Sequence, residues 1–365
     1  MKVTERITGT QLGMLLFSFV FPALVIPAPG IMAAFAKQNA WISVFPGALL
    51  GVTNIWVMTA LSNRYPGLTI LEYTEKIVGK WLGKALSLYF FYYWYSLVTV
   101  VINEHSRFLN TFLLPRTPTI VGGLTIVVLS ALAVYAGIEV IGRCNSFLTV
   151  LIIMFLLPLF VLALQDTDIK HLMPVLGEGI VPVLQGSFPV SANINQVFLL
   201  GWLIPFLKQR QKARRAGMIA LFGIVTLIVT VNLLTVMIFG PITGKLTYSF
   251  LSLIQYIGIQ GSFERLEAIA VAIWVFGIFV KVSVGLFMLS LCLSHVFGIR
   301  NYRDIVAPLA LLALVGAVWS FTTKSDYQQF ETFTYPLWAI VTQNLLPAVL
   351  LAADAIKRKA SGSLL

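Results

Sequence analysis

The sequence predicts an all-α integral membrane protein with ten transmembrane helices, built as a five-plus-five inverted repeat in which helices 1 and 6 are discontinuous. Three observations predict this fold: few charges, ten long apolar stretches, and interruptions in the first and sixth of them. Of the 365 residues only 25 are Lys or Arg and 14 are Asp or Glu, whereas 58% are hydrophobic. Charged residues amount to 11%, against roughly 25% in soluble domains. A water-soluble globule is therefore excluded.

Each of the ten stretches holds about 20 predominantly apolar residues, the length needed to cross a bilayer as a helix. They cover residues 9–35, 40–62, 84–112, 118–137, 145–164, 183–207, 216–240, 266–298, 305–322 and 334–356. We expect one transmembrane domain over 1–365, with a first five-helix repeat at 9–164 and a second at 183–356. An odd number of spans in each half inverts the second half relative to the first, as in secondary transporters.

The distribution of Lys and Arg predicts the orientation. Seventeen of these residues fall in segments that are inside if the N-terminus is inside, and five fall in the outer segments, namely Lys37, Arg116, Lys170, Lys245 and Lys324. This bias predicts that both termini are cytoplasmic. It also explains the net charge of +11 without a nucleic-acid partner. The basic run 208–215 fits either a positive-inside loop or a site for anionic lipid.

The first and sixth spans are the least helix-like. The first contains FPALVIPAPG, and the sixth contains VPVLQGSFPVSANINQ. Proline removes a backbone donor, and irregular backbone survives in a membrane only where it packs in protein or lines a wet cavity. The alternative is that the prolines only kink two helices. We expect an unwound ligand-binding lining from Pro22, Ala23, Val25, Pro27, Gly186, Ser187, Pro189 and Ser191, with a wall from Tyr93 and Leu97 of the third span.

Two charged clusters lie near the outer ends of the third and eighth spans. We expect them to meet as an outer gate or structural clamp formed by Glu104, Arg107, Glu264, Arg265 and Glu267. The alternative is that they are interfacial charges with no mutual partner.

Lys281 lies deep in the eighth span, about 21 Å along the helix from Glu267. Exposure of its ammonium to lipid would be costly, and Gly277 and Gly285 share its helical face and permit a neighbouring helix to approach. We therefore expect Lys281 to face the bundle interior as a coupling or latch residue, near the carbonyls released by the broken first span. The alternative is a lysine that snorkels to the inner interface.

Enzyme chemistry has little support in the sequence. Cys144 and Cys292 are far apart, and neither a metal-ligand cluster nor a phosphate-binding glycine loop is present. We expect no cofactor, no metal site and no catalytic residue.

Four stretches resemble a known family: ERITGTQLG, TILEYTEKIVGKWLGK, YAGIEVIGR and ERLEAIAVAIWVFGIFVK. By their order and spacing the chain resembles the permease-like B subunit of bacterial endospore germinant receptors, a branch of the amino acid/polyamine/organocation transporter superfamily. The resemblance implies a LeuT-like fold, a germinant site between spans one, three, six and eight, and A-type and C-type partner subunits in the spore inner membrane. Germinants of this family are typically amino acids.

The break in the first span departs from that pattern. Amino acid carriers of the superfamily usually place glycine-rich backbone there, whereas this chain has three prolines and one late glycine, Gly30. The identity of the germinant is therefore not transferred. Three functions stay open: a germinant sensor, a proton-coupled amino acid symporter, and a water or ion conduit.

Overall fold

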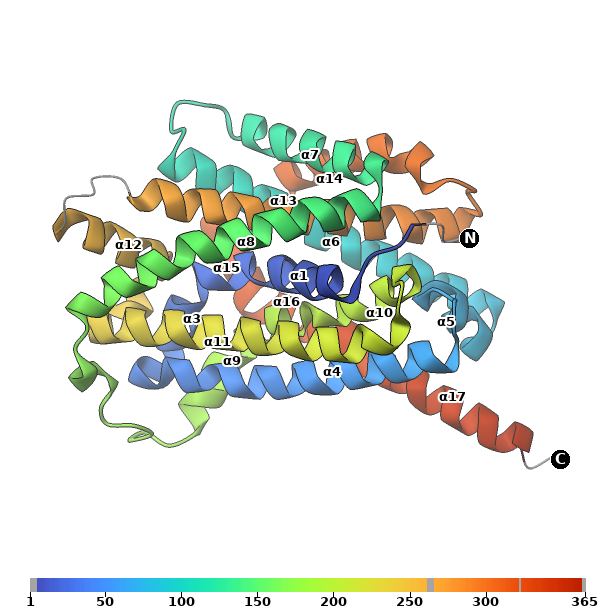
Figure 1. The fold of residues 1–365 in the computed structure, drawn as a ribbon, viewed down its shortest axis with the longest axis horizontal. Coiled ribbons are helices and arrows are strands. Elements are labelled where there is room, and N and C mark those ends of the chain that lie inside the picture. The colour runs from blue at the N-terminus through green and yellow to red at the C-terminus, as the bar shows by residue number, and fades with distance from the viewer. Residues whose placement is uncertain (1–4, 261–265, 322, 363–365) are drawn as a thin grey trace.

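The computed structural model describes residues 5–260, 266–321 and 323–362. Within these ranges the chain is helical, and its one β-bridge pairs Ile7 with Leu207. The long helices run roughly side by side, and the first turn of α1 and the last helix, α17, lie toward the same end of the bundle (Figure 1). We call this end the terminal face and the other end the opposite face.

Eight helical segments of the described chain are long and apolar enough to cross a membrane. Seven of them contain the expected spans two to five and seven to nine, formed by α4 (Val44–Arg64), α6 (Lys80–Phe112), α7 (Thr119–Ala136), α8 (Ile138–Ala163), α11 (Ala213–Phe239), α13 (Leu266–Phe297) and α14 (Val306–Trp319). The eighth contains span ten. Many large apolar side chains on their outer sides are exposed, Phe147 and Phe222 among them, as lipid contact requires.

Span one is broken where the prolines predict it. It consists of α1 (Gly9–Val20), α2 (Pro22–Val25) and α3 (Ala28–Ala36), interrupted at Phe21 and at residues 26–27. Side chains from later helices satisfy the released backbone groups. Trp274 Nε1 donates to the Pro22 carbonyl at 3.2 Å, and the Gly30 amide donates to Ser249 Oγ at 2.8 Å. Ser249 begins α12 (Ser249–Gln260), a helix inside what the sequence suggested was a long connection.

Span six is also discontinuous, but its break lies later than expected. Helix α9 (Val181–Ile194) continues through Pro189, and the interruption is a 3-10 turn at Asn195–Phe198 before α10 (Leu199–Leu203). The expected unwinding between Gly186 and Ser191 is therefore not seen. The Asn195 side-chain amide donates to the Ser191 carbonyl at 2.8 Å, and such side-chain bonds compete with the helical ladder at this point.

Span ten begins at Lys324 rather than at residue 334. It comprises α15 (Lys324–Gln329), a π-helical turn (Phe330–Thr334), α16 (Tyr335–Ala339), a second π-turn (Ile340–Leu345) and α17 (Leu346–Gly362). Single π-turns inside helices frequently occur at functional sites. The earlier start brings Tyr327 and Glu331 into the bundle.

An N-terminal strap, residues 5–8, crosses the terminal face. The Glu5 carboxylate accepts hydrogen bonds from the Ile138 amide at 2.7 Å, the Tyr302 hydroxyl at 2.9 Å and Arg303 Nη2 at 2.7 Å. Gly137, at φ +97°, permits this approach, because a Cβ there would lie 2.6 Å from a Glu5 oxygen. The strap therefore ties together the turns between α7 and α8 and between α13 and α14.

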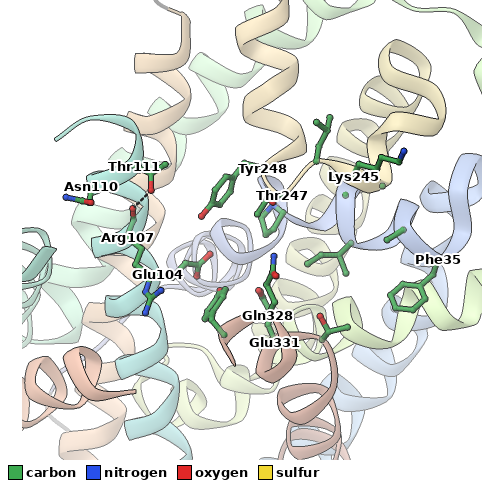
Figure 2. Close-up of a pocket in the computed structure, with 18 of the residues that line it drawn as sticks. Phe35, Glu104, Arg107, Asn110, Thr111, Lys245, Thr247, Tyr248, Gln328 and Glu331 are labelled. Carbon is green, nitrogen blue, oxygen red and sulfur yellow. Dashed lines mark hydrogen bonds between the residues drawn. The ribbon is translucent and has the colours of Figure 1, made fainter. Parts of the chain in front are cut away.

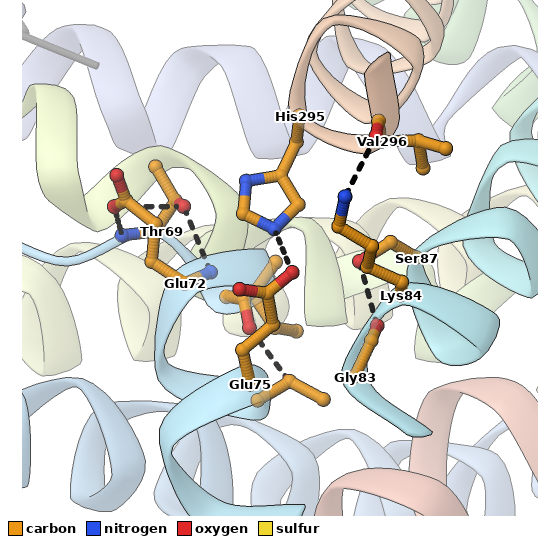
Figure 3. A network of polar contacts seen from close by, with 10 residues as sticks. Thr69, Glu72, Glu75, Gly83, Lys84, Ser87, His295 and Val296 are labelled. Atoms are coloured by element: carbon orange, nitrogen blue, oxygen red, sulfur yellow. Dashed lines mark hydrogen bonds and ion pairs between the residues drawn. The ribbon is translucent and has the colours of Figure 1, made fainter. Parts of the chain in front are cut away.

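The short helix α5 (Ile70–Val78) is fastened to its neighbours at the terminal face. Thr69 and Glu72 form a reciprocal capping box at its start, and Glu75 Oε1 lies 3.0 Å from His295 Nε2 near the end of α13 (Figure 3). Lys84 of α6 donates to the Val296 carbonyl at 3.4 Å. These contacts hold α5, α6 and α13 together at the terminal face.

Candidate functional site

A vestibule of about 550 Å³ opens at the opposite face. Its walls come from α3, the end of α6, the segment 244–248 and the start of span ten. Glu104 and Arg107 lie on one wall, and Tyr248 and Glu331 face the same space (Figure 2). Burial, with the nearby Glu104 and Glu331 carboxylates, raises the pKa of Tyr248 to about 12. Its phenol therefore stays neutral and offers a hydrogen-bond donor to a solute in the vestibule.

A second, inner cavity of about 40 Å³ lies deeper in the bundle. Spans one, three, six, eight and ten all contribute to it, through Ala23, Leu97, Gln196, Lys281 and Tyr335 among others. Three residues line both the vestibule and the inner cavity, namely Glu104, Tyr327 and Glu331. These side chains therefore form the boundary between the two spaces.

Lys281 is 1% exposed, midway along α13. Its Nζ donates to Gln196 Oε1 at 2.8 Å and lies 5.3 Å from the centroid of the Phe19 ring. The ammonium thus contacts the break in span six, whereas the expected contact was with carbonyls of span one. Gly277 and Gly285 allow neighbouring helices to approach closely, as the sequence predicts. A Cβ at Gly277 would overlap Pro22, and a Cβ at Gly285 would lie 2.6 Å from Val98 Cγ2.

An amide network holds Gln196 in place. Its Nε2 donates to Asn193 Oδ1 at 3.0 Å and to the Tyr335 hydroxyl at 2.6 Å. The three hydrogen-bonding partners of the Gln196 side-chain amide, Asn193, Lys281 and Tyr335, thus come from spans six, eight and ten. A movement of any of these spans would therefore alter the hydrogen bond between Lys281 and Gln196.

Two carboxylates complete the charges of the inner cavity. Glu104 and Glu331 both interact electrostatically with Lys281, and the Tyr327 side chain hydrogen-bonds with both carboxylates. Lys281 is buried, whereas Glu104 and Glu331 are half-buried at the boundary with the vestibule, and a buried charge is costly unless it is paired. The arrangement is suited to a solute that carries charges of both signs.

Aromatic side chains close the inner cavity toward the terminal face. The ring centroids of Trp94 and Phe198 are 5.5 Å apart, those of Trp94 and Trp202 also 5.5 Å, and those of Phe90 and Trp202 5.1 Å. Since α6 runs from the terminal to the opposite face, this cluster lies on the terminal side of Leu97. The cluster thus lies between the inner cavity and a pocket of about 560 Å³ at the terminal face, which Trp202 and His295 line.

The residues expected to bind ligand fall into two groups. Ala23 and Leu97 line the inner cavity, and Pro27 lines the vestibule. The other residues are packed against protein. Pro22 lies against α13, and Val25 lies in the core. Tyr93 packs on Trp338, and the Tyr93 hydroxyl accepts a hydrogen bond from Gln343 Nε2 at 2.6 Å. In α9, Gly186 packs on Met32 and Ser43, Ser191 packs beside Gly47, and Ser187 and Pro189 are buried.

The residues expected to form an outer gate are only partly brought together. Glu104 and Arg107 share the vestibule, but Arg107 Nη2 donates to the Phe321 carbonyl at 2.6 Å. Glu267 lies in the first turn of α13. Glu264 and Arg265 lie outside the described residues.

Sequence reasoning missed the contribution of span ten. Tyr327, Phe330, Glu331, Tyr335 and Trp338 all line the inner cavity. A signal was present, because Tyr327, Glu331 and Tyr335 recur every four residues and so share one helical face. The placement of span ten at 334–356 excluded the first two from consideration.

Comparison with known proteins decides the family. The family model described as spore germination protein, or spore permease, matches residues 6–326. The chain belongs to the spore permease family. Relatives from Bacillus subtilis (strain 168) include spore germination protein YndE, 29% identical over 80% of this chain and 82% of that protein, and spore germination protein KB, 27% identical over 97% and 95%.

Solved structures show the same fold at low identity. The Na⁺-coupled sialic acid symporter, in a substrate-bound outward-open state, superposes with a TM-score of 0.68 at 13% identity and covers 93% of this chain and 78% of that one. The nucleobase-cation-symport-1 transporter Mhp1, closed with bromovinylhydantoin bound, gives 0.66 at 14%, with 96% and 78% covered. The spore permease chain therefore has the LeuT-type fold.

Proposed function

We propose that this spore permease is a membrane-embedded, transporter-like subunit of a spore germinant receptor. It binds a small germinant, an amino acid, at mid-membrane and signals germination together with A-type and C-type receptor subunits. The observation that carries the proposal is the inner cavity, which Lys281, Glu104 and Glu331 line together beside the breaks in spans one and six. The relatives' names support a role in spore germination.

The charges of the cavity match a zwitterion. The ammonium of Lys281 offers a partner for a carboxylate, and Glu104 or Glu331 offers a partner for an α-ammonium group. Charge-assisted hydrogen bonds of this kind are stronger than neutral ones. The apolar lining from Leu97, Phe330 and other residues, with a volume of about 40 Å³, favours a small apolar side chain.

The signal follows from two conformations of one scaffold. In this structure the vestibule is open at the opposite face, while the aromatic cluster lies between the inner cavity and the terminal face. A germinant that binds one conformation more tightly shifts the population toward it. The partner subunits would respond to this change of conformation. In this proposal residues 9–164 and 183–356 form the inverted repeats, and both termini are cytoplasmic in the spore inner membrane.

A proton-coupled amino acid symporter is the second candidate. It is favoured by the buried charge cluster and by a fold shared with cation-coupled transporters. The sensor and the symporter differ in whether the protein carries the solute across the membrane. A symporter accumulates solute when a gradient is applied, whereas a sensor needs only equilibrium binding.

Measurements on proteoliposomes distinguish the sensor from the symporter. Binding and uptake of a labelled amino acid panel would be measured with and without a pH gradient, for the wild type and Lys281→Ala. Saturable binding without accumulation supports the sensor. Gradient-driven accumulation that is lost in Lys281→Ala supports the symporter, and absence of binding with partner subunits present removes both.

A further inference from the structure

A pocket of about 480 Å³ lies at the terminal face, beside the N-terminal strap. Arg6 of the strap lines it together with four residues that connect spans six and seven, namely Leu207, Lys208, Arg210 and Gln211. Two backbone hydrogen bonds join these segments, because the Ile7 amide donates to the Phe206 carbonyl at 2.8 Å and the Lys208 amide donates to the Ile7 carbonyl at 2.9 Å. The pocket therefore lies on a fixed junction between the start of span one and the end of span six.

The lining of this pocket carries three positive charges, from Arg6, Lys208 and Arg210, and no acidic residue. Lys208 is exposed and Arg210 is half-buried. Among the described residues, neither of these two side chains has a hydrogen-bond or ion-pair partner. Arg6 Nη1 donates to the Pro205 carbonyl at 3.1 Å, which uses only one of the five N–H groups of its guanidinium.

The acidic residues beside the strap are already paired. Glu5 Oε1 lies 2.7 Å from Arg303 Nη2, and Glu139 Oε2 lies 3.5 Å from Arg143 Nη2. Like charges that share a pocket repel one another, so an anion between them would be stabilising. A phosphate group fits this pocket, because guanidinium and ammonium groups both donate charge-assisted hydrogen bonds to phosphate oxygens.

The pocket is continuous with the lipid-facing side of α11. Gln211 precedes this helix, and Arg215, Ile219 and Phe222 follow it at intervals of four, four and three residues, so all four lie on one helical face. Ile219 is 60% exposed and Phe222 is 73% exposed. A phospholipid could therefore place its phosphate in the pocket and its acyl chains along Ile219 and Phe222.

We propose that this terminal pocket binds the phosphate of an anionic phospholipid. Arg6, Lys208 and Arg210 contact the phosphate. A zwitterionic headgroup fits less well, because the lining offers no carboxylate to its ammonium group. A soluble phosphate compound has the same polar chemistry, but the continuity with the lipid-facing side of α11 favours the membrane source. The bound lipid would link the start of span one to the end of span six.

Thermal unfolding of the purified protein in detergent tests the proposal with three probes. These are dihexanoyl-phosphatidylglycerol, dihexanoyl-phosphatidylcholine and sn-glycerol 3-phosphate. A ligand of the folded state raises the midpoint temperature by mass action, and we expect a saturable rise with the phosphatidylglycerol only. An equal rise with the phosphatidylcholine overturns the preference for an anionic headgroup, and an equal rise with glycerol phosphate overturns the membrane source. No rise with the phosphatidylglycerol refutes the site.

A double variant locates the effect. Lys208→Gln combined with Arg210→Gln should raise the half-saturating concentration of the phosphatidylglycerol roughly tenfold to thirtyfold, since each basic side chain near a membrane surface contributes about fivefold. The matched control combines Lys80→Gln with Arg300→Gln, which removes one exposed Lys and one exposed Arg from the same face outside the pocket, and should change the concentration by less than about threefold.

Equal losses in the two double variants would show a diffuse effect of charge and overturn the pocket. A response of the Lys208→Gln, Arg210→Gln variant like that of the wild type would also refute the site. If that double variant does not fold, the exposed Lys208→Gln alone decides, with an expected loss of roughly fivefold.

Discussion

Lys281 of α13 and Gln196 of the span-six break are joined by a hydrogen bond of 2.8 Å at the floor of the inner cavity. The bond links a continuous helix to a discontinuous one. The ammonium also lies near Glu104 and Glu331, which border the vestibule. A solute that competes for Lys281 or for either carboxylate would therefore alter the contact between spans six and eight.

Lys281→Met retains most of the apolar stem but removes the charge. We expect amino acid affinity to fall roughly tenfold to a hundredfold, the range for a hydrogen bond to a charged group. Equilibrium binding of labelled amino acid measures the change. The control is Lys245→Met, at an exposed lysine of the vestibule, which should change affinity by less than about threefold, since exposed charges contribute little. Equal effects of the two variants would exclude Lys281 as a ligand contact.

Gly277→Ala should destabilise the protein by about 1 to 3 kcal/mol, the usual cost of overpacking. The added Cβ would overlap Pro22 and lie 2.9 Å from a ring carbon of Phe21. The thermal midpoint in detergent measures the loss. Gly223→Ala is the matched control, because its Cβ would make only an ordinary contact at 3.7 Å with Phe17. That variant should be neutral or up to about 1 kcal/mol more stable, from helix propensity. A stable Gly277→Ala would show that α13 does not require this close contact.

Glu5→Gln should loosen the terminal face, since a neutral amide weakens the contact with Arg303 and loses an acceptor for Tyr302 or Ile138. Reactivity of the buried Cys292 toward a thiol reagent, in a Cys144→Ala background, reports the opening. We expect labelling to accelerate severalfold. Glu178→Gln, which weakens the exposed Lys37–Glu178 pair on the opposite face, should leave the rate unchanged. Unaltered labelling in Glu5→Gln would mean that the strap does not hold the face closed.

Asp354→Asn tests the anchor of span ten. Asp354 is 1% exposed and accepts from Arg64 at 2.7 Å and Arg358 at 2.9 Å. Because both arginines are partly exposed, we expect a loss of only about 1 to 3 kcal/mol, seen as a lower thermal midpoint. Arg143→Gln, in the exposed Glu139–Arg143 pair, should cost less than about 0.5 kcal/mol. Similar midpoints for the two variants would contradict an anchoring role.

The span pattern and the break in span one were predictable because they follow from local sequence. Apolar stretches set the helix lengths, and the prolines at 22, 27 and 29 remove backbone donors from span one. The direction of Lys281 was predictable too, since Gly277 and Gly285 mark the face on which a neighbour can approach. These inferences need no knowledge of distant contacts.

The rest depends on tertiary contacts. Pro189 did not mark the break in span six: α9 continues through it to Ile194, and the 3-10 turn begins at Asn195. Glu5 forms its bonds with residues more than 130 positions away. Glu331 was missed because the polar segment that carries it reads as a loop, although it is held inside the bundle. Such pairings leave no local periodic signal.

The most direct test of the zwitterion site is competition binding to the purified protein in nanodiscs. A labelled amino acid that binds the wild type would be displaced with three analogues: the unlabelled amino acid, its N-acetyl derivative and its methyl ester. We expect both modified analogues to compete at least roughly tenfold more weakly, because each loses one charge-assisted contact, and Lys281→Met to lose the preference for the free acid over the ester. Equal competition by all three analogues would contradict recognition of the ligand by Lys281 and the two carboxylates.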